Sequence, residues 1–211
     1  MQITRLGHSC LHVVDRDADL LVDPGVFSSG FEDLTGLTGI LITHQHADHL
    51  DLDRLPAVLE ANPGVRVYAD RGAAAQLAEN GIEATAVAAG DSFDVGTPVT
   101  VHGIDHAVIY REIPIVPNAS YLIGERLLHP GDALMVPDVP VEILAVPAAA
   151  PWMALKEAID YLRTVHPTVA FPIHDGVVNP PALPIYYGQL GTFAPEGTSW
   201  LALGGTESVG V

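Results

Sequence analysis

The feature that most constrains this chain is a short apolar run that ends in a cluster of histidines and aspartates. Ile40, Leu41 and Ile42 form an aliphatic segment typical of a buried strand, and residues 43–51 (THQHADHLD) follow it directly. The cluster brings three histidines and two aspartates into eight residues. The sequence therefore predicts a chemically active loop at the carboxyl end of a strand.

The spacing within this loop indicates metal ligands. In extended backbone the side chains of His44 and His46 project to the same side, so both imidazoles can approach one zinc-like ion. Asp48 and His49 are adjacent and their side chains diverge, which suits a second ligand set about 3.5–4 Å from the first ion. One loop can therefore serve two metals. The alternative is a solvated polar loop.

The His-x-His-x-Asp-His pattern after a strand resembles the metallo-β-lactamase superfamily. Residues 20–25 (LLVDPG) and 7–9 (GHS) resemble the branch that includes the L-ascorbate 6-phosphate lactonase-like proteins. This resemblance implies an α/β protein with the four-layer αββα sandwich of that superfamily, in a single domain over residues 1–211. It also implies a binuclear centre of two divalent ions, zinc or otherwise manganese or iron, that activates a hydroxide for hydrolysis.

For the first ion, the resemblance implies His44, His46 and a third histidine farther along the chain. Residues 97–106 are expected to form a strand, and His106 at its end is the candidate for the third ligand. His102 in the same strand is the competitor. A surface histidine without a bound ion is the remaining alternative.

For the second ion, the resemblance implies Asp48, His49 and His174, which follows a predicted strand over 168–173. A predicted hairpin about Gly124-Glu125 leads to residues 129–132 (HPGD), in which Asp132 would bridge the two ions. An ordinary turn aspartate is the alternative for Asp132. Asp48 would also act in catalysis, by orienting the hydroxide and passing its proton to the leaving group.

The implied reaction is hydrolysis of a small lactone, cyclic ester or phosphodiester. Tyr110, Arg111 and Lys156 could form a local anion pocket, or each could lie in solvent. Two other functions stay open: a mononuclear-iron dioxygenase of the same fold, and a metal-binding member that is not catalytic. Di-iron members of the superfamily carry glutamate at the position of His46, which makes that redox chemistry a weaker interpretation.

Several other residues allow two interpretations each. Asp23 is either a carboxylate that steers a metal-bound imidazole or a turn aspartate before proline. His8 either lines the mouth of the site or is a structural histidine with satisfied hydrogen bonds. Trp152 could form an apolar wall for substrate or anchor the core. His12, His129 and His166 are expected to be structural, with His129 alternatively supporting a ligand.

The remaining pattern alternates between strands and helices, which predicts an α/β layer. Pro56 fits a helix only if it falls in the first turn. Residues 26–38 form a loop that could overhang the site, and the tail, 177–211, offers no evident ligand and could cover the site or an oligomer interface. The expected strands cover 2–7, 10–15, 18–23, 65–69, 82–88 and 141–146, and the expected helices cover 52–61, 72–80 and 153–165.

Composition limits the partners. The net charge of −17 argues against nucleic-acid binding, because the chain has no run of Lys or Arg to neutralise phosphates. No apolar run approaches the roughly 20 residues of a membrane span and no signal peptide is evident, so we expect a cytoplasmic protein with a small-molecule substrate. Cys10 is the only cysteine, which excludes an intramolecular disulfide. The oligomeric state stays open.

Overall fold

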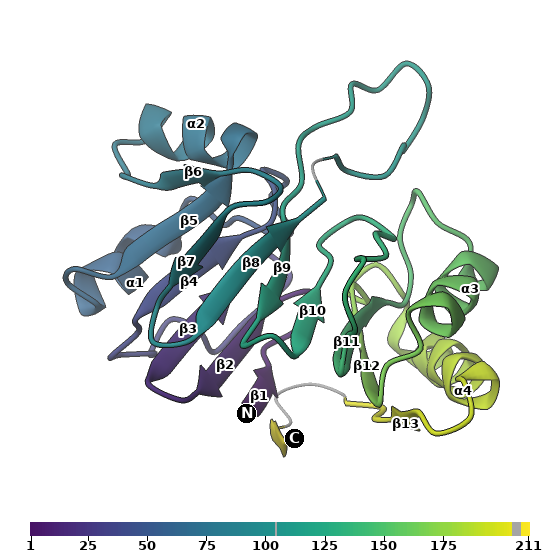
Figure 1. The fold of residues 1–211 in the computed structure, drawn as a ribbon. Helices are drawn as coiled ribbons and strands as arrows, with labels where there is room; N and C mark the ends of the chain where they lie inside the picture. The colour runs from purple at the N-terminus through teal and green to yellow at the C-terminus, as the bar shows by residue number, and fades with distance from the viewer. Residues whose placement is uncertain (104, 204–207) are drawn as a thin grey trace.

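Two β-sheets packed face to face, with helices on their outer faces, make up the protein (Figure 1). The structure, a computed structural model, describes residues 1–103, 105–203 and 208–211. This is the αββα sandwich that the sequence predicts. No helix in these described ranges is long and apolar enough to cross a membrane.

The first sheet has seven strands in the order β14-β1-β2-β3-β4-β5-β6. Antiparallel strands lie at one side of the sheet, and the parallel strands β3 to β6 lie at the other. The strands are β1 (Gln2–Arg5), β2 (Leu11–Asp15), β3 (Ala18–Val22), β4 (Gly39–Ile42), β5 (Arg66–Asp70), β6 (Thr85–Val87) and β14 (Ser208–Gly210).

The second sheet also has seven strands, in the order β13-β12-β11-β10-β9-β8-β7. The predicted hairpin about Gly124-Glu125 is confirmed, since β9 and β10 pair antiparallel with Ile123 opposite Leu127. The strands are β7 (Ser92–Asp94), β8 (Pro98–His102), β9 (Ser120–Ile123), β10 (Leu127–His129), β11 (Ile143–Pro147), β12 (Val169–Ile173) and β13 (Ser199–Trp200).

Helices cover the outer face of each sheet (Figure 1). The first sheet carries α1 (Leu55–Ala61) and α2 (Arg71–Glu79), and the second carries α3 (Leu155–Val165) and α4 (Leu183–Phe193), which follows a 3₁₀ turn at Pro180–Ala182. Between the sheets lies a core with side chains from both, such as Leu41, Tyr121 and Phe171. Strand β4 is buried along its whole length because both of its faces are covered.

Several predicted boundaries are wrong by a few residues. The first helix begins at Leu55 and not at residue 52, with Pro56 in its first turn as the ring requires. The strand predicted over 82–88 is only Thr85–Val87, and the one predicted over 97–106 ends at His102. Ile104 in that prediction lies outside the described residues. Asp105 pairs with Pro117 in an isolated bridge.

The tail has more structure than its sequence pattern indicates. Helix α4 packs on α3, and β14 pairs with β1, so that Val209 lies opposite Ile3 from the other end of the chain. Gly188 and Gly191 weaken the local helix signal, and the partner of β14 is some 200 residues away in sequence. Residues 204–207 of this tail lie outside the described residues.

Candidate metal centre

Three histidines form a group at the end of β4. His44 Nε2 lies 3.1 Å from His46 Nδ1, and His106, from the segment between β8 and β9, completes a set of donor atoms that lie within 4.8 Å of one another. The structure thus brings His106 to the place expected for the third ligand. Its competitor, His102, belongs to none of the donor groups found among the described residues.

A second group lies beside the first. Asp48, His49, His174 and His8 offer donor atoms within 4.8 Å of one another. Asp48 Oδ2 lies 3.6 Å from His174 Nε2 and 3.9 Å from His49 Nε2. His174 follows β12 directly, so the two sheets each contribute ligands at the edge where their strands end.

Asp132 faces both groups. Its Oδ1 lies 3.0 Å from His49 Nε2, while its Oδ2 lies 3.2 Å from His106 Nε2 and 3.0 Å from His174 Nε2. The carboxylate is 3% exposed. This is the position expected of a bridging ligand.

Contacts behind the imidazoles fix which ring nitrogen carries a proton. His106 Nδ1 lies 2.5 Å from the carbonyl oxygen of Ala107, and His174 Nδ1 lies 2.7 Å from that of Ala149. A carbonyl oxygen only accepts hydrogen bonds, so both Nδ1 atoms donate, and in the neutral imidazole each Nε2 then has a free lone pair. The lone pairs point at Asp132 and the interior of the site, as metal ligands require.

Asp23 holds the third such imidazole, that of His49. Its Oδ2 accepts from His49 Nδ1 at 2.7 Å, and its two oxygens also accept from the backbone N–H and the hydroxyl of Thr43, each at 2.7 Å. Asp23 is fully buried and its φ of +47° lies in the left-handed region. Of its two interpretations, the geometry matches the carboxylate that steers an imidazole.

The buried atoms at the centre have no hydrogen-bond partner among the described residues. These atoms are Nε2 of His49, His106 and His174, and Oδ1 of Asp132. An unpaired buried polar atom costs about 1–3 kcal/mol, and here four of them converge. A cation would satisfy them together, and imidazole nitrogen with carboxylate oxygen is a donor set that zinc accepts. The residues therefore fit the implied metal ions.

Burial and charged neighbours shift the pKa values of the groups at the centre. Burial opposes a charge on His49, yet Asp132 and Asp23 raise its pKa well above the ordinary value. Burial likewise opposes ionisation of Asp132, but His49 and His174 lower its pKa well below the usual range. For His44, burial and the nearby His49 lower the pKa. The carboxylates thus favour a positive charge at His49, whereas burial disfavours one at His44.

His8 has a different role from the other members of its group. Its Nδ1 accepts a hydrogen bond from the Gly176 N–H at 3.0 Å, so its Nε2 carries the proton and donates to Asp48 Oδ2 at 3.2 Å. Burial is the main cause that lowers the pKa of His8 to about 4, which keeps the ring neutral. Burial opposes charge on Asp48, but His8 and then His49 lower its pKa to about 2.

The sequence analysis did not predict two contacts to Asp132. The indole Nε1–H of Trp152 donates to Asp132 Oδ2 at 2.9 Å, and Asn118 Oδ1 accepts the Asp132 backbone N–H at 3.0 Å. Trp152 therefore lies in the site and not in the core. Tryptophan needs a partner for its N–H when it is partly buried, but the sequence alone does not say which one.

Glycine allows the loops of the site to meet. A Cβ on Gly25 would lie 1.9 Å from the carbonyl oxygen of Asp48 and 2.5 Å from the backbone nitrogen of His49. The turn after β3 and the ligand loop are thus in direct backbone contact. Only a residue without a side chain permits this approach.

The other candidate residues lie elsewhere. His129 is structural, since its Nε2 donates to the Ser9 carbonyl at 2.8 Å and its Nδ1 accepts from Gly131 at 3.3 Å. His12 pairs with Asp19 at 2.7 Å, and His166 forms the C-cap of α3. Tyr110 and Arg111 are exposed, and Arg111 pairs with Glu112 at 2.9 Å. Lys156 lies at the start of α3 and in none of the cavities described below.

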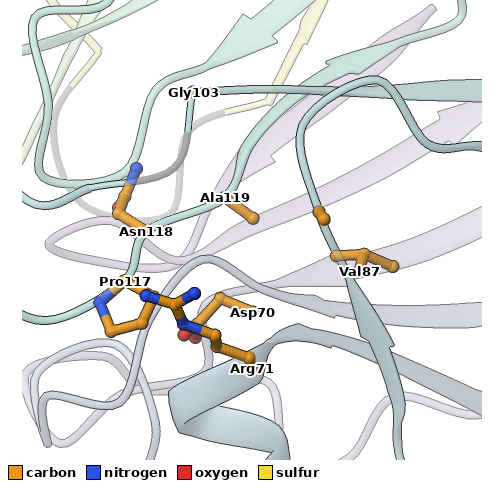
Figure 2. A pocket seen from close by; sticks show the side chains of 8 residues that line it. Asp70, Arg71, Val87, Gly103, Pro117, Asn118 and Ala119 are labelled. Carbon is orange, nitrogen blue, oxygen red and sulfur yellow. The ribbon is translucent and has the colours of Figure 1, made fainter.

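Two cavities lie at or near the candidate metal centre, and the candidate ligands line only the larger one. A cavity of about 350 Å³ opens above the ligands and is lined by His46, Asp48, His106, Asp132 and His174 among others. A smaller one, of about 90 Å³, lies between the start of α2 and residues 117–119 (Figure 2). Figure 2 shows Arg71 beside Pro117, with Val87 across from them; the candidate ligands do not line this cavity.

The chain is similar to proteins of known family. The model of the β-lactamase superfamily domain matches residues 2–174. Protein Rv0786c of Mycobacterium tuberculosis is 53% identical over 197 residues, which cover 90% of this chain and 91% of that one. A UPF0173 metal-dependent hydrolase of Aeropyrum pernix is 26% identical, with 89% and 86% covered.

A solved structure shares the fold. Igni18, a metallo hydrolase from the archaeon Ignicoccus hospitalis, superposes with a TM-score of 0.72 at 17% sequence identity. The likeness covers 100% of this chain and 98% of that one. At this identity the likeness concerns the fold alone.

Proposed function

The chain belongs to the β-lactamase superfamily, and we propose that it is a hydrolase that uses two divalent ions to cleave a small lactone, ester or phosphodiester. The Aeropyrum and Ignicoccus proteins are themselves named a metal-dependent hydrolase and a metallo hydrolase, which agrees with this part of the proposal. The observation that carries it is the convergence of four buried, unpartnered donor atoms from both sheets. Only the sequence motifs favour the branch of L-ascorbate 6-phosphate lactonase-like proteins.

We assign the ligands by group. His44, His46 and His106 would hold one ion, and Asp48, His49 and His174 the other, with Asp132 between them. Imidazole and carboxylate ligands favour zinc, while manganese and iron are also compatible with this set. When bound, such a pair of ions lowers the pKa of a water toward neutrality and polarises a carbonyl or phosphoryl oxygen.

Asp48 is the residue we propose to act on the attacking water. A carboxylate with a pKa of about 2 stays charged at neutral pH, so its oxygen accepts a hydrogen bond and thereby orients the water. His8 fixes the carboxylate from behind through its Nε2–H. The low pKa makes Asp48 better suited to orienting the water than to storing its proton, which Oδ2 would pass on to the leaving group.

Trp152 and Asp23 set the geometry of the ligands. Trp152 donates to the oxygen of Asp132 that faces both His106 and His174, and Asp23 fixes the ring of His49. Oriented ligands bind metal more tightly because less freedom is lost on binding. Trp152 and Phe27 also line the cavity above the ligands.

The test is the metal content per chain, measured by elemental analysis after purification without added metal, together with turnover of bis(4-nitrophenyl) phosphate and of a simple lactone. We expect about two ions per chain and turnover of at least one of the two substrates. His174→Ala should lose about one ion, while His12→Ala, a change at a surface ion pair, should lose none. One iron per chain would favour a dioxygenase, and two ions without any turnover would favour a non-catalytic metal-binding protein.

A further inference from the structure

The cavity above the ligands has an apolar wall. Apart from the candidate ligands and Ala47, the described residues that line it are all larger apolar side chains from four separate segments. They are Val26, Phe27, Ile109, Pro151, Trp152 and Val177.

Several of these side chains are open to solvent. Val26 is 46% exposed, Phe27 is 52% exposed and Val177 is 45% exposed. Ile109 belongs to the segment between β8 and β9, which extends beyond the ends of both sheets (Figure 1) and exposes further apolar side chains. These apolar side chains surround one opening. A ligand with an apolar part would cover them and so remove their surface from water, which favours binding.

A second cavity lies next to the first. It has a volume of about 380 Å³ and shares Pro151 and Val177 with the cavity above the ligands. Ala149, Val178 and Tyr186 line it farther on, toward α4. We refer to these two neighbouring cavities together as the apolar groove; Asn179 also lines the second cavity.

The lining of the two cavities disfavours a substrate that carries a phosphate away from the reacting bond. Among the described residues that line either cavity there is no lysine and no arginine. Arg111 is in the same segment as Ile109, but its side chain is 79% exposed and it pairs with Glu112. A phosphate remote from the scissile bond would therefore lie in this groove without a cationic partner, at a cost in free energy.

We propose that the substrate is an uncharged ester or lactone with an apolar chain or ring that lies along this groove, and not a phosphorylated sugar lactone. This inference rests on the proposed hydrolase function. The reacting bond lies at the ligands, and the apolar group extends between Trp152 and Val177 toward Tyr186.

The test compares esters that differ only in the length of the acyl chain, and lactones with an apolar or a phosphorylated remote group, using the full chain loaded with zinc. We expect kcat/KM for 4-nitrophenyl esters to rise about tenfold from acetate to hexanoate, because each buried methylene favours binding. We also expect γ-decalactone to be a better substrate than 6-phosphogluconolactone. A flat series, or preference for the phosphorylated lactone, would overturn the inference while leaving the hydrolase function intact.

A matched pair of variants tests the groove itself. Val177→Asn places an amide between the two cavities and should lower the ratio of hexanoate to acetate turnover at least fivefold. Val139→Asn changes a valine of similar exposure, 41%, that lines neither cavity and should leave the ratio unchanged. Equal ratios in both variants would contradict the inference.

If the zinc-loaded protein cleaves bis(4-nitrophenyl) phosphate but none of these compounds, the inference is overturned and the hydrolase function stands. If it cleaves neither, the proposed function fails and the groove is tested by binding. Calorimetry with sodium octanoate and sodium acetate then compares ligands that share a carboxylate and differ in apolar length. At least tenfold tighter binding of octanoate supports the groove. Equal affinities overturn it.

Discussion

The indole of Trp152 donates its only hydrogen bond to Asp132 Oδ2, at 2.9 Å, across 20 residues of sequence. The same oxygen lies within 3.2 Å of both His106 and His174. The hydrogen bond thus acts on the one carboxylate that faces both candidate metal positions. A loop side chain that sequence patterns assign either to a wall or to the core is part of the centre.

Replacing Trp152 by phenylalanine removes this donor and keeps most of the apolar surface. We expect zinc affinity, measured by competition with a chelator, or kcat to fall about 10- to 100-fold, because loss of an outer partner leaves the Asp132 carboxylate free to rotate. Trp200→Phe, at the other tryptophan, should have little effect on either. If both variants keep the affinity and activity of the natural protein, the hydrogen bond has no functional role.

Two histidines that were alternatives in the sequence make a direct comparison. His106→Ala should lower the metal content from about two ions per chain to about one, because it removes a member of the first donor group. His102→Ala should leave the content unchanged, since His102 belongs to none of the groups found among the described residues. Elemental analysis after dialysis measures both. Loss of metal in His102→Ala alone would reverse the assignment.

Gly25→Ala should push the turn after β3 away from the ligand loop and so destabilise the protein. Its Cβ would lie 1.9 Å from the Asp48 carbonyl oxygen, so the two loops must separate, and we expect the free energy of unfolding to fall by about 3 kcal/mol or more. Gly188→Ala in α4 meets open space and should raise it by about 0.5–1 kcal/mol. Urea unfolding and zinc content measure both. Equal effects of the two variants would show that the contact at Gly25 can relax.

Asp70 should make stability depend on pH. Its oxygens accept from the N–H groups of Gly72 and Ala73 at the start of α2, but burial outweighs these bonds and raises its pKa to about 6. A carboxyl whose folded pKa is raised contributes stability that is present below its unfolded pKa near 4 and is lost as the pH rises through about 6.

Asp70→Asn stays neutral at every pH. Relative to the natural protein, we therefore expect its free energy of unfolding to increase by about 1–3 kcal/mol between pH 4.5 and pH 7.5, measured by urea unfolding of metal-free protein. Asp33→Asn, at an exposed position, should show no such change. The same pH dependence in both variants would exclude Asp70 as its source.

Much of the site was predictable because its signals are local. The aliphatic strand before His44 and the alternation of His44 and His46 depend on residues close in sequence, whereas Asp132 and His174, each just after a strand, were expected from the superfamily resemblance. The position of His106 was also predicted, although β8 ends at His102 and His106 lies in the segment beyond it. Strand ends of an α/β sandwich gather at one edge, so these residues could be expected to meet.

Other features depended on contacts between distant segments. The pairing of β14 with β1, the packing of α4 on α3 and the hydrogen bond from Trp152 to Asp132 each join residues whose own neighbours in sequence carry no sign of the partner. The short edge strand β7 was also missed, because three residues with one apolar side chain give too weak an alternation.

The sequence by itself predicted an α/β layer and a candidate ligand loop, because periodicity and ligand spacing are properties of short segments; the αββα sandwich and the remaining candidate ligands followed from the superfamily resemblance. Only the tertiary structure favoured one interpretation each for Asp23 and Trp152, placed buried His8 against Asp48, and revealed the apolar groove beside the ligands. The reason is physical: a hydrogen-bond partner and a cavity wall are set by side chains that the fold brings together from both sheets and their loops.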